Sequence, residues 1–109
     1  MAWKRAASCA ALEQGDVTAV DCSGAHLALY RLEDGIFATS ASCPHMGGSL
    51  AAGTIVNGYI ECPVHCALFD IRTGAADGAI TSQPLRTFPT RVEDDGIYVD
   101  LPVAEERMP

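Results

Sequence analysis

The chain has 109 residues, of which 49% are apolar and 19% charged, and seven Lys and Arg against fourteen Asp and Glu give a net charge of −7. This length suits one hydrophobic core, and the apolar share excludes a disordered polyelectrolyte. Nucleic acid is excluded as the expected partner, because phosphate binding needs clustered cations. We therefore expect residues 1–109 to form a single domain.

No apolar run approaches the roughly 18–20 residues that span a bilayer, and no apolar signal segment precedes Cys9. These features predict a cytoplasmic protein without membrane contact. Thiols stay reduced in that compartment, so the cysteines are expected to be core residues or metal ligands rather than disulfides. The five cysteines are Cys9, Cys22, Cys43, Cys62 and Cys66.

In chain order, residues 8–14 are the only stretch with helical character, and it is short. Apolar or alternating runs follow, separated by the turn dipeptides Ser23-Gly24, Asp34-Gly35, Asn57-Gly58 and Asp95-Gly96. These runs predict strands at residues 17–22, 26–32, 36–40, 54–56, 59–62, 67–71, 87–93 and 96–101. Residues 72–84 are expected to form a long loop, and residues 102–109 a frayed tail. The pattern predicts an all-β antiparallel sandwich or small barrel.

Two short motifs each combine a cysteine with a histidine. Cys43-Pro44-His45 and Cys62-Pro63-Val64-His65 both follow a predicted strand, which brings them to one end of the sheet. Gly47 and Gly48 follow the first motif and allow the backbone to approach a buried ligand closely.

Two metal centres suit this donor set. Structural zinc accepts two cysteines and two histidines, but common zinc sites pair like with like. A Rieske [2Fe–2S] centre instead has two cysteines on one iron and two histidines on the other, so mixed pairs allow two loops to clamp it. The spacing favours the second centre.

The chain resembles the Rieske-type ferredoxins of bacterial aromatic-ring-hydroxylating dioxygenases. The resemblance extends from Trp3 to Leu101, and three parts of the sequence carry it in addition to the two motifs: Phe69-Asp70, Thr73-Gly74 and the closing segment from Phe88 to Val99. It implies an antiparallel Rieske fold with a cluster-binding part at about residues 41–72. It also implies that Cys43 and Cys62 ligate the buried iron, and that His45 and His65 ligate the outer one.

The departures from respiratory-complex Rieske proteins define the branch. Those proteins have a cysteine in each loop, joined as a disulfide, where this chain has Gly48 and Val64. They also have serine and tyrosine donors to the cluster where this chain has Ala67 and Phe69. The resemblance is therefore to the low-potential ferredoxins.

The remaining candidates have simpler interpretations. Cys66 is expected to be a small packed residue, Cys9 and Cys22 core or surface thiols, and His26 a surface histidine. Met46 is expected to cover the cluster rather than bind it. Glu33, Asp34, Asp94 and Asp95 lie in predicted turns and are candidates for an acidic docking surface.

The resemblance implies a one-electron carrier rather than an enzyme. It would accept electrons from a flavin-containing NAD(P)H reductase and pass them to a terminal Rieske oxygenase, and it is expected to act as a monomer. The alternatives are an accessory Rieske subunit of another redox enzyme, such as a nitrite reductase, and a zinc-stapled interaction module. The sequence does not identify the aromatic substrate, because the carrier does not touch it.

Overall fold

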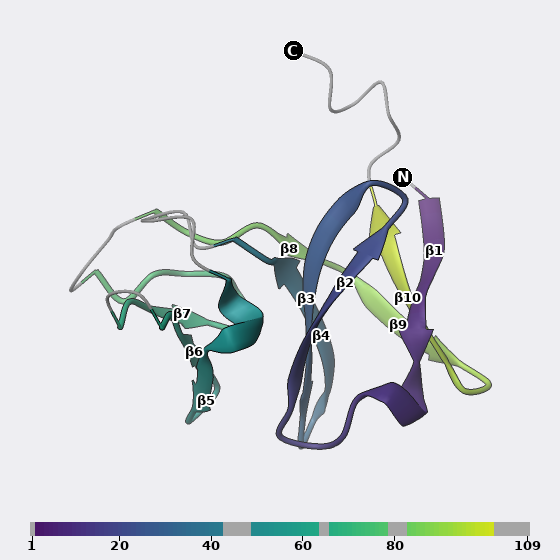
Figure 1. Ribbon diagram of the computed structural model, residues 1–109, viewed down its shortest axis with the longest axis horizontal. Helices are drawn as coiled ribbons and strands as arrows, with labels where there is room; N and C mark the ends of the chain where they lie inside the picture. Colours follow the sequence, from purple (N-terminus) through teal and green to yellow (C-terminus); the bar gives the residue numbers. More distant parts are fainter. Residues whose placement is uncertain (1, 43–48, 64–65, 79–82, 102–109) are drawn as a thin grey trace, which may run out of the picture.

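The computed structural model describes residues 2–42, 49–63, 66–78 and 83–101, which form three antiparallel sheets (Figure 1). The strands are β1 (Ala2–Ser8), β2 (Val17–Cys22), β3 (Ala25–Leu32), β4 (Gly35–Ser40), β5 (Thr54–Val56), β6 (Tyr59–Glu61), β7 (Leu68–Asp70), β8 (Thr87–Phe88), β9 (Thr90–Glu93) and β10 (Gly96–Leu101). Two 3-10 turns complete the described elements, η1 (Cys9–Ala11) and η2 (Leu50–Ala52). The predicted all-β antiparallel class is confirmed.

The sheets are stacked in layers. One outer sheet has the order β1-β10-β9, the middle sheet β2-β3-β4-β8 and the other outer sheet β5-β6-β7. Figure 1 shows the first two packed together and the third, with η2, on the other side of the middle sheet. We call the first two sheets the sandwich, and η2 with β5–β7 the β5–β7 unit.

Strand β3 is buried on both faces because it lies in the middle layer. Leu27 and Leu29 face the first outer sheet and pack with Ile97 and Val99 of β10. Ala28 and Tyr30 alternate with these leucines and belong to a second hydrophobic cluster, which includes residues of the β5–β7 unit. The described residues therefore form two hydrophobic cores, one on each face of the middle sheet.

The predicted hairpin turns form where the dipeptides indicated. Ser23 and Gly24 have φ values of 50° and 84°, and Asn57 and Gly58 have 50° and 82°. These values match the left-handed turn that suits a two-residue hairpin. At the last hairpin the positive φ (54°) belongs to Asp94, whereas we expected Gly96 to supply it.

The structure differs from the sequence expectations at two strands. Strand β1 was not predicted, because its residues show no clean alternation; pairing with β10 along most of its length makes it a strand. The predicted strand at 87–93 is two strands, because Pro89 lacks an N–H and divides it into β8 and β9 in different sheets.

The short helical stretch is a single 3-10 turn, η1. In the predicted long loop, residues 72–78 and 83–84 contain no strand, and Ala76 forms an isolated bridge with Phe69. Residues 79–82 and the predicted tail at 102–109 lie outside the described residues. No helix among those described is long and apolar enough to span a bilayer.

Candidate metal centre

The first Cys-His motif begins just beyond the end of β4. Ser42 and Ser49 form an isolated antiparallel bridge, and the amide of Leu50 donates to the carbonyl oxygen of Ala41 at 2.8 Å. Ala41 and Leu50 are both buried. These contacts bring the two ends of the segment together and fix its base in the core. Cys43, His45, Met46 and the two glycines lie outside the described residues.

The second motif begins at Cys62, directly after β6. The amide of Cys62 donates to the carbonyl oxygen of Ala67 at 2.8 Å, and the amide of Cys66 donates to the carbonyl oxygen of Cys62 at 2.9 Å. Cys62 is 1% exposed, so its sulfur lies among apolar side chains at the base of a tight turn. His65 lies outside the described residues.

The two motifs start from different sheets, contrary to the expectation of one sheet end. The first follows β4 of the middle sheet, and the second follows β6 of the β5–β7 unit. Their bases nevertheless meet, because Ala41, Leu50, Cys62 and Ala67 belong to one hydrophobic cluster. A core between two layers therefore brings the motifs together.

Two side chains that share the buried cluster with Cys62 carry no hydroxyl group. Ala67 and Phe69 are fully buried in the same cluster. Tyr30 is also in this cluster, but its hydroxyl lies 2.8 Å from Oγ1 of Thr39, in the middle sheet. Burial raises the pKa of Tyr30 to about 12, so its phenol is neutral at physiological pH.

Cys9, Cys22 and Cys66 form no disulfide within the described part of the chain. Cys66 is exposed, with a φ of 59°, so the expectation of a packed residue is wrong: the tight turn from Cys62 directs position 66 outward. Cys22 is buried in the sandwich core, which raises its thiol pKa, and Cys9 is half-buried. His26 is exposed, as predicted, and its Nδ1 lies 2.7 Å from Asp21.

No group of three or more His, Cys, Asp or Glu side chains converges within the described ranges, which include only Cys62 of the four predicted ligands. The ligand set Cys43, His45, Cys62 and His65 therefore stays a prediction. The structure places a buried cysteine, Cys62, at the base of one motif, in the same hydrophobic cluster as the base of the other.

Family comparison decides the class of the centre. A profile of the Rieske [2Fe-2S] domain matches residues 2–89. The chain belongs to the Rieske [2Fe-2S] domain family. Its cofactor is thus a Rieske-type [2Fe–2S] cluster, and zinc is excluded as the resident metal.

The Rieske chain is similar along most of its length to ferredoxin components. It is 35% identical over 99 residues to the ferredoxin component of the naphthalene 1,2-dioxygenase system of Pseudomonas putida, a match covering 91% of this chain and 95% of that one. The solved ferredoxin of carbazole 1,9a-dioxygenase from Nocardioides aromaticivorans IC177 superposes with a TM-score of 0.84 at 32% identity, covering 91% and 97%.

Two further structures bear on the partner and on the alternative function. A complex of reduced oxygenase and oxidised ferredoxin in carbazole 1,9a-dioxygenase contains a chain matched with a TM-score of 0.81 at 33% identity, covering 89% of this chain and 91% of that one. A Mycobacterium tuberculosis protein assigned as an NADH-dependent nitrite reductase small subunit has a TM-score of 0.81 at 23% identity, covering 94% and 97%. This second likeness shows the fold alone.

The described residues of the Rieske domain fit such a cluster. An anionic thiolate is costly in an apolar core unless a metal compensates its charge, so a cysteine as buried as Cys62 suits the inner iron of the family's centre. The surrounding hydrocarbon excludes water from that side. When bound, the cluster supplies one-electron redox chemistry.

Sequence reasoning missed the ionic contact between Arg72 and Asp34. Arg72 lies at the start of the predicted loop and pairs with Asp34. From the sequence, we considered Asp34 only as an acidic residue of a turn and a candidate for the docking surface. The two residues are 38 positions apart, and no local signal joins them. The guanidinium holds the pKa of the Asp34 carboxyl below its usual value by hydrogen bonding.

Proposed function

We propose that this chain is the one-electron carrier that connects a flavin-containing NAD(P)H reductase with the terminal oxygenase of an aromatic-ring dioxygenase system. One observation carries the proposal: the match to the naphthalene dioxygenase ferredoxin covers 95% of that protein. The likeness therefore extends over nearly the whole length of a carrier. The chain is an electron-transfer component, not itself an enzyme.

We propose Cys43, His45, Cys62 and His65 as the cluster ligands, the cysteines on one iron and the histidines on the other. The burial of Cys62 and the common core of the two motif bases support this set. We also propose that the whole chain forms one domain, with the cluster-binding part at about residues 41–72. A monomer in the cytoplasm, with the reductase and the oxygenase as successive partners, completes the proposal.

Cys62 and Cys66 provide a matched test of the ligand set, because both are cysteines of one turn with opposite exposure. We expect Cys62→Ala to lose the visible absorption and the electron paramagnetic resonance signal of the cluster, and Cys66→Ala to keep both. The same comparison for histidine sets His45→Ala and His65→Ala against His26→Ala. A Cys62 variant with a normal spectrum would contradict the ligand assignment.

The carrier role is tested by turnover. Purified reductase and oxygenase of an aromatic-ring dioxygenase system should oxidise substrate only when the holo-protein is added, at a rate proportional to its concentration. Its reduction by NADH with the reductase alone should bleach the cluster by one electron. If the holo-protein is not reduced, or is reduced but does not support turnover, the proposed position between the two partners is wrong.

The nitrite-reductase alternative is not favoured by any described residue, since the likeness to such subunits is one of fold. The same assay with nitrite as acceptor distinguishes it, because a nitrite reductase subunit would support nitrite consumption.

A further inference from the structure

Arg72 joins the β5–β7 unit to the sandwich. Its Nε donates to Oδ2 of Asp34 at 2.9 Å and its Nη2 to Oδ1 at 2.6 Å. Arg72 follows the end of β7, and Asp34 lies in the turn between β3 and β4. The pair is therefore a two-pronged ionic contact between two layers, and such a fork fixes orientation as well as distance.

The same guanidinium contacts two other segments. Its carbon lies 5.3 Å from the centroid of the Phe37 ring in β4. Gly58, in the turn between β5 and β6, leaves room for it, because a Cβ there would lie 2.8 Å from Nη1. Arg72 is thus held between the turn of its own unit and two points of the sandwich.

The backbone beneath Arg72 is itself fixed. Oδ1 of Asp70 accepts hydrogen bonds from the amides of Arg72 at 2.8 Å and Thr73 at 3.2 Å. The amide of Ile71 donates to the carbonyl oxygen of Gly58 at 3.0 Å. The position of the Arg72 backbone is therefore coupled to β7 and, through Gly58, to β6. Strand β6 is followed directly by Cys62.

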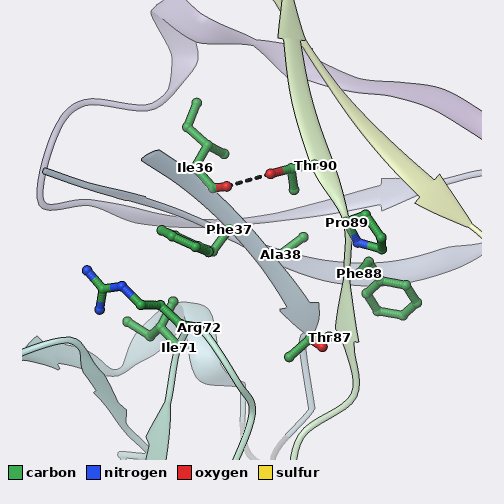
Figure 2. A pocket seen from close by; sticks show the side chains of 9 residues that line it. All are labelled: Ile36, Phe37, Ala38, Ile71, Arg72, Thr87, Phe88, Pro89 and Thr90. Atoms are coloured by element: carbon green, nitrogen blue, oxygen red, sulfur yellow. Dashed lines mark hydrogen bonds between the residues drawn. The ribbon is translucent and has the colours of Figure 1, made fainter. Parts of the chain in front are cut away.

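The junction around Arg72 is otherwise open. A groove of about 410 Å³ lies on one side, lined by residues 36–38, 71–72 and 87–90 (Figure 2). A hollow of about 370 Å³ borders Arg72 together with the turns at 32–33 and 57–58. Figure 2 shows Ile71 and Arg72 on one side of the groove and Thr87 to Pro89 across it. Arg72 bridges the two parts beside this groove.

We propose that Arg72 is a positioning residue that, through Asp34, holds the β5–β7 unit in one orientation on the sandwich. We call this Arg72–Asp34 contact the clamp. Because the unit carries Cys62, the clamp also fixes the orientation of the cluster relative to the sandwich when a partner docks. This second consequence rests on the proposed carrier function, whereas the first does not.

Arg91 offers a matched control. It has a similar exposed fraction, 49% against 43%, it pairs with Glu93 at 3.0 Å, and it stacks 4.5 Å from the Trp3 ring centroid. Its contacts lie within the β1-β10-β9 sheet and not between layers. Arg72→Gln and Arg91→Gln therefore remove the same charge and the same kind of contacts at two different places.

The first experiment measures amide hydrogen exchange of the holo-protein by mass spectrometry. We expect Arg72→Gln to speed exchange about three- to tenfold in peptides from residues 54–61 and 66–77, with β3 and β10 unchanged, because the loss concerns one unit. Arg91→Gln should leave those peptides unchanged. Unchanged exchange in the unit, or equal acceleration over the whole molecule, would overturn the proposal.

A double-mutant comparison tests whether Arg72 acts through Asp34. We expect Asp34→Asn to loosen the same peptides, and the double variant Asp34→Asn with Arg72→Gln to exceed neither single variant by more than about a factor of two, since contacting residues are not additive. Multiplied effects in the double variant would show two separate roles and contradict the clamp.

The docking consequence is measured with oxygenase as acceptor. We expect Arg72→Gln to raise the KM for the carrier about three- to fivefold, with kcat within a factor of two and the cluster spectrum unchanged, because only a fraction of molecules remains competent to dock. An unchanged KM would overturn this consequence. If the wild type supports no turnover at all, the carrier function fails, while the exchange results still decide the clamp.

Discussion

At the scale of single residues, the first residue of the second motif, Cys62, lies in a cluster of buried, mostly apolar side chains. Ala67 and Phe69, at the positions where high-potential Rieske proteins have hydroxyl donors, are both fully buried beside Cys62. Hydrogen bonds to the sulfurs favour the reduced cluster, because its sulfurs carry more negative charge. The chain should therefore have a potential near the low end of the Rieske range, about −150 mV.

Adding the two hydroxyls should raise the potential. If about half the strength of a charged hydrogen bond differs between redox states, each donor contributes on the order of 30–60 mV. Protein-film voltammetry of Ala67→Ser with Phe69→Tyr would measure this shift. Phe88→Tyr, at a partly buried side chain packed against the sandwich core, controls for adding a phenol. No shift in a double variant with a normal cluster spectrum would contradict the hydroxyl mechanism.

Tyr30 makes stability depend on alkaline pH. Its pKa of about 12 exceeds the ordinary value of 10.0, so between these values the folded state binds more protons than the unfolded state. The free energy of unfolding must then fall as pH rises from about 10 to 12, by up to about 2–3 kcal/mol. Below pH 10 the contribution is fully present.

The variant Tyr30→Phe isolates this effect. At pH 7 we expect it to be less stable by about 1 kcal/mol, the loss of one hydrogen bond, because Thr39 still donates to the carbonyl oxygen of Ser40 at 2.8 Å. Denaturant unfolding at pH 9, 10 and 11 would then show the difference from wild type shrinking. A constant difference would mean that Tyr30 does not titrate with a raised pKa.

At the scale of elements, the hairpins could be predicted and the long-range pairings could not. Ser23-Gly24 and Asn57-Gly58 favour one turn type by themselves, so β2 and β5 have the predicted bounds. Strand β1 depends on β10, which is far along the chain, and a window of sequence does not contain its partner. Pro89 was readable as a strand break, and the prediction of one strand across it overlooked the missing N–H.

The candidate site divides in the same way. The cofactor could be predicted from the two Cys-His motifs, because each motif is a short continuous segment of sequence. The family comparison confirmed that cofactor. Arg72 and Asp34 meet only because β4, β6 and β7 bring their turns together, so neither residue type nor spacing indicated the pair.

Two glycines near the end of β7 allow a controlled test of packing. Gly74 and Gly78 have φ values of 80° and 87°, so alanine strains the backbone at both. A Cβ at Gly74 would overlap the carbonyl oxygen of Leu85, whereas a Cβ at Gly78 would meet no atom of the described residues within 4 Å. The two positions differ in the space available and share a similar positive φ.

We expect Gly78→Ala to lower the free energy of unfolding by about 1–2 kcal/mol through backbone strain. Gly74→Ala should lose a further 1–3 kcal/mol or so, because the Leu85 backbone must move. Denaturant midpoints of the two holo-variants would measure the difference. Equal losses would mean that the contact between residues 74 and 85 adds nothing beyond the shared strain.

At the scale of the whole molecule, the net charge of −7 should steer association with basic partner surfaces. The candidate acids at the turns are exposed, although Asp34 is paired with Arg72 and Oδ1 of Asp95 lies 4.0 Å from Nη2 of Arg5. Exposed charges are screened beyond about 8–10 Å near physiological ionic strength. Long-range attraction should therefore weaken as salt is added.

Turnover with the carrier at limiting concentration should slow at least severalfold between about 20 mM and 500 mM salt. Asp94→Asn with Asp95→Asn should flatten this slope without breaking the turn, because asparagine tolerates the positive φ at position 94. A flat response in the wild type would mean that apolar contacts dominate docking.

The two cores share the middle sheet but differ in what stabilises them. The core between the outer β1-β10-β9 sheet and the middle sheet is built from side chains alone, including Leu27, Ile97 and Val99. The other core contains Cys62 and the bases of both motifs, so with Cys62 as the proposed ligand we expect its cohesion to depend on the binding of iron and sulfide. A chain that loses its cluster would keep the core of the sandwich intact, and the core that contains Cys62 would loosen. Proteolysis would then begin in the iron-dependent core, which makes the loaded cluster a condition for the lifetime of the polypeptide as well as for its redox activity.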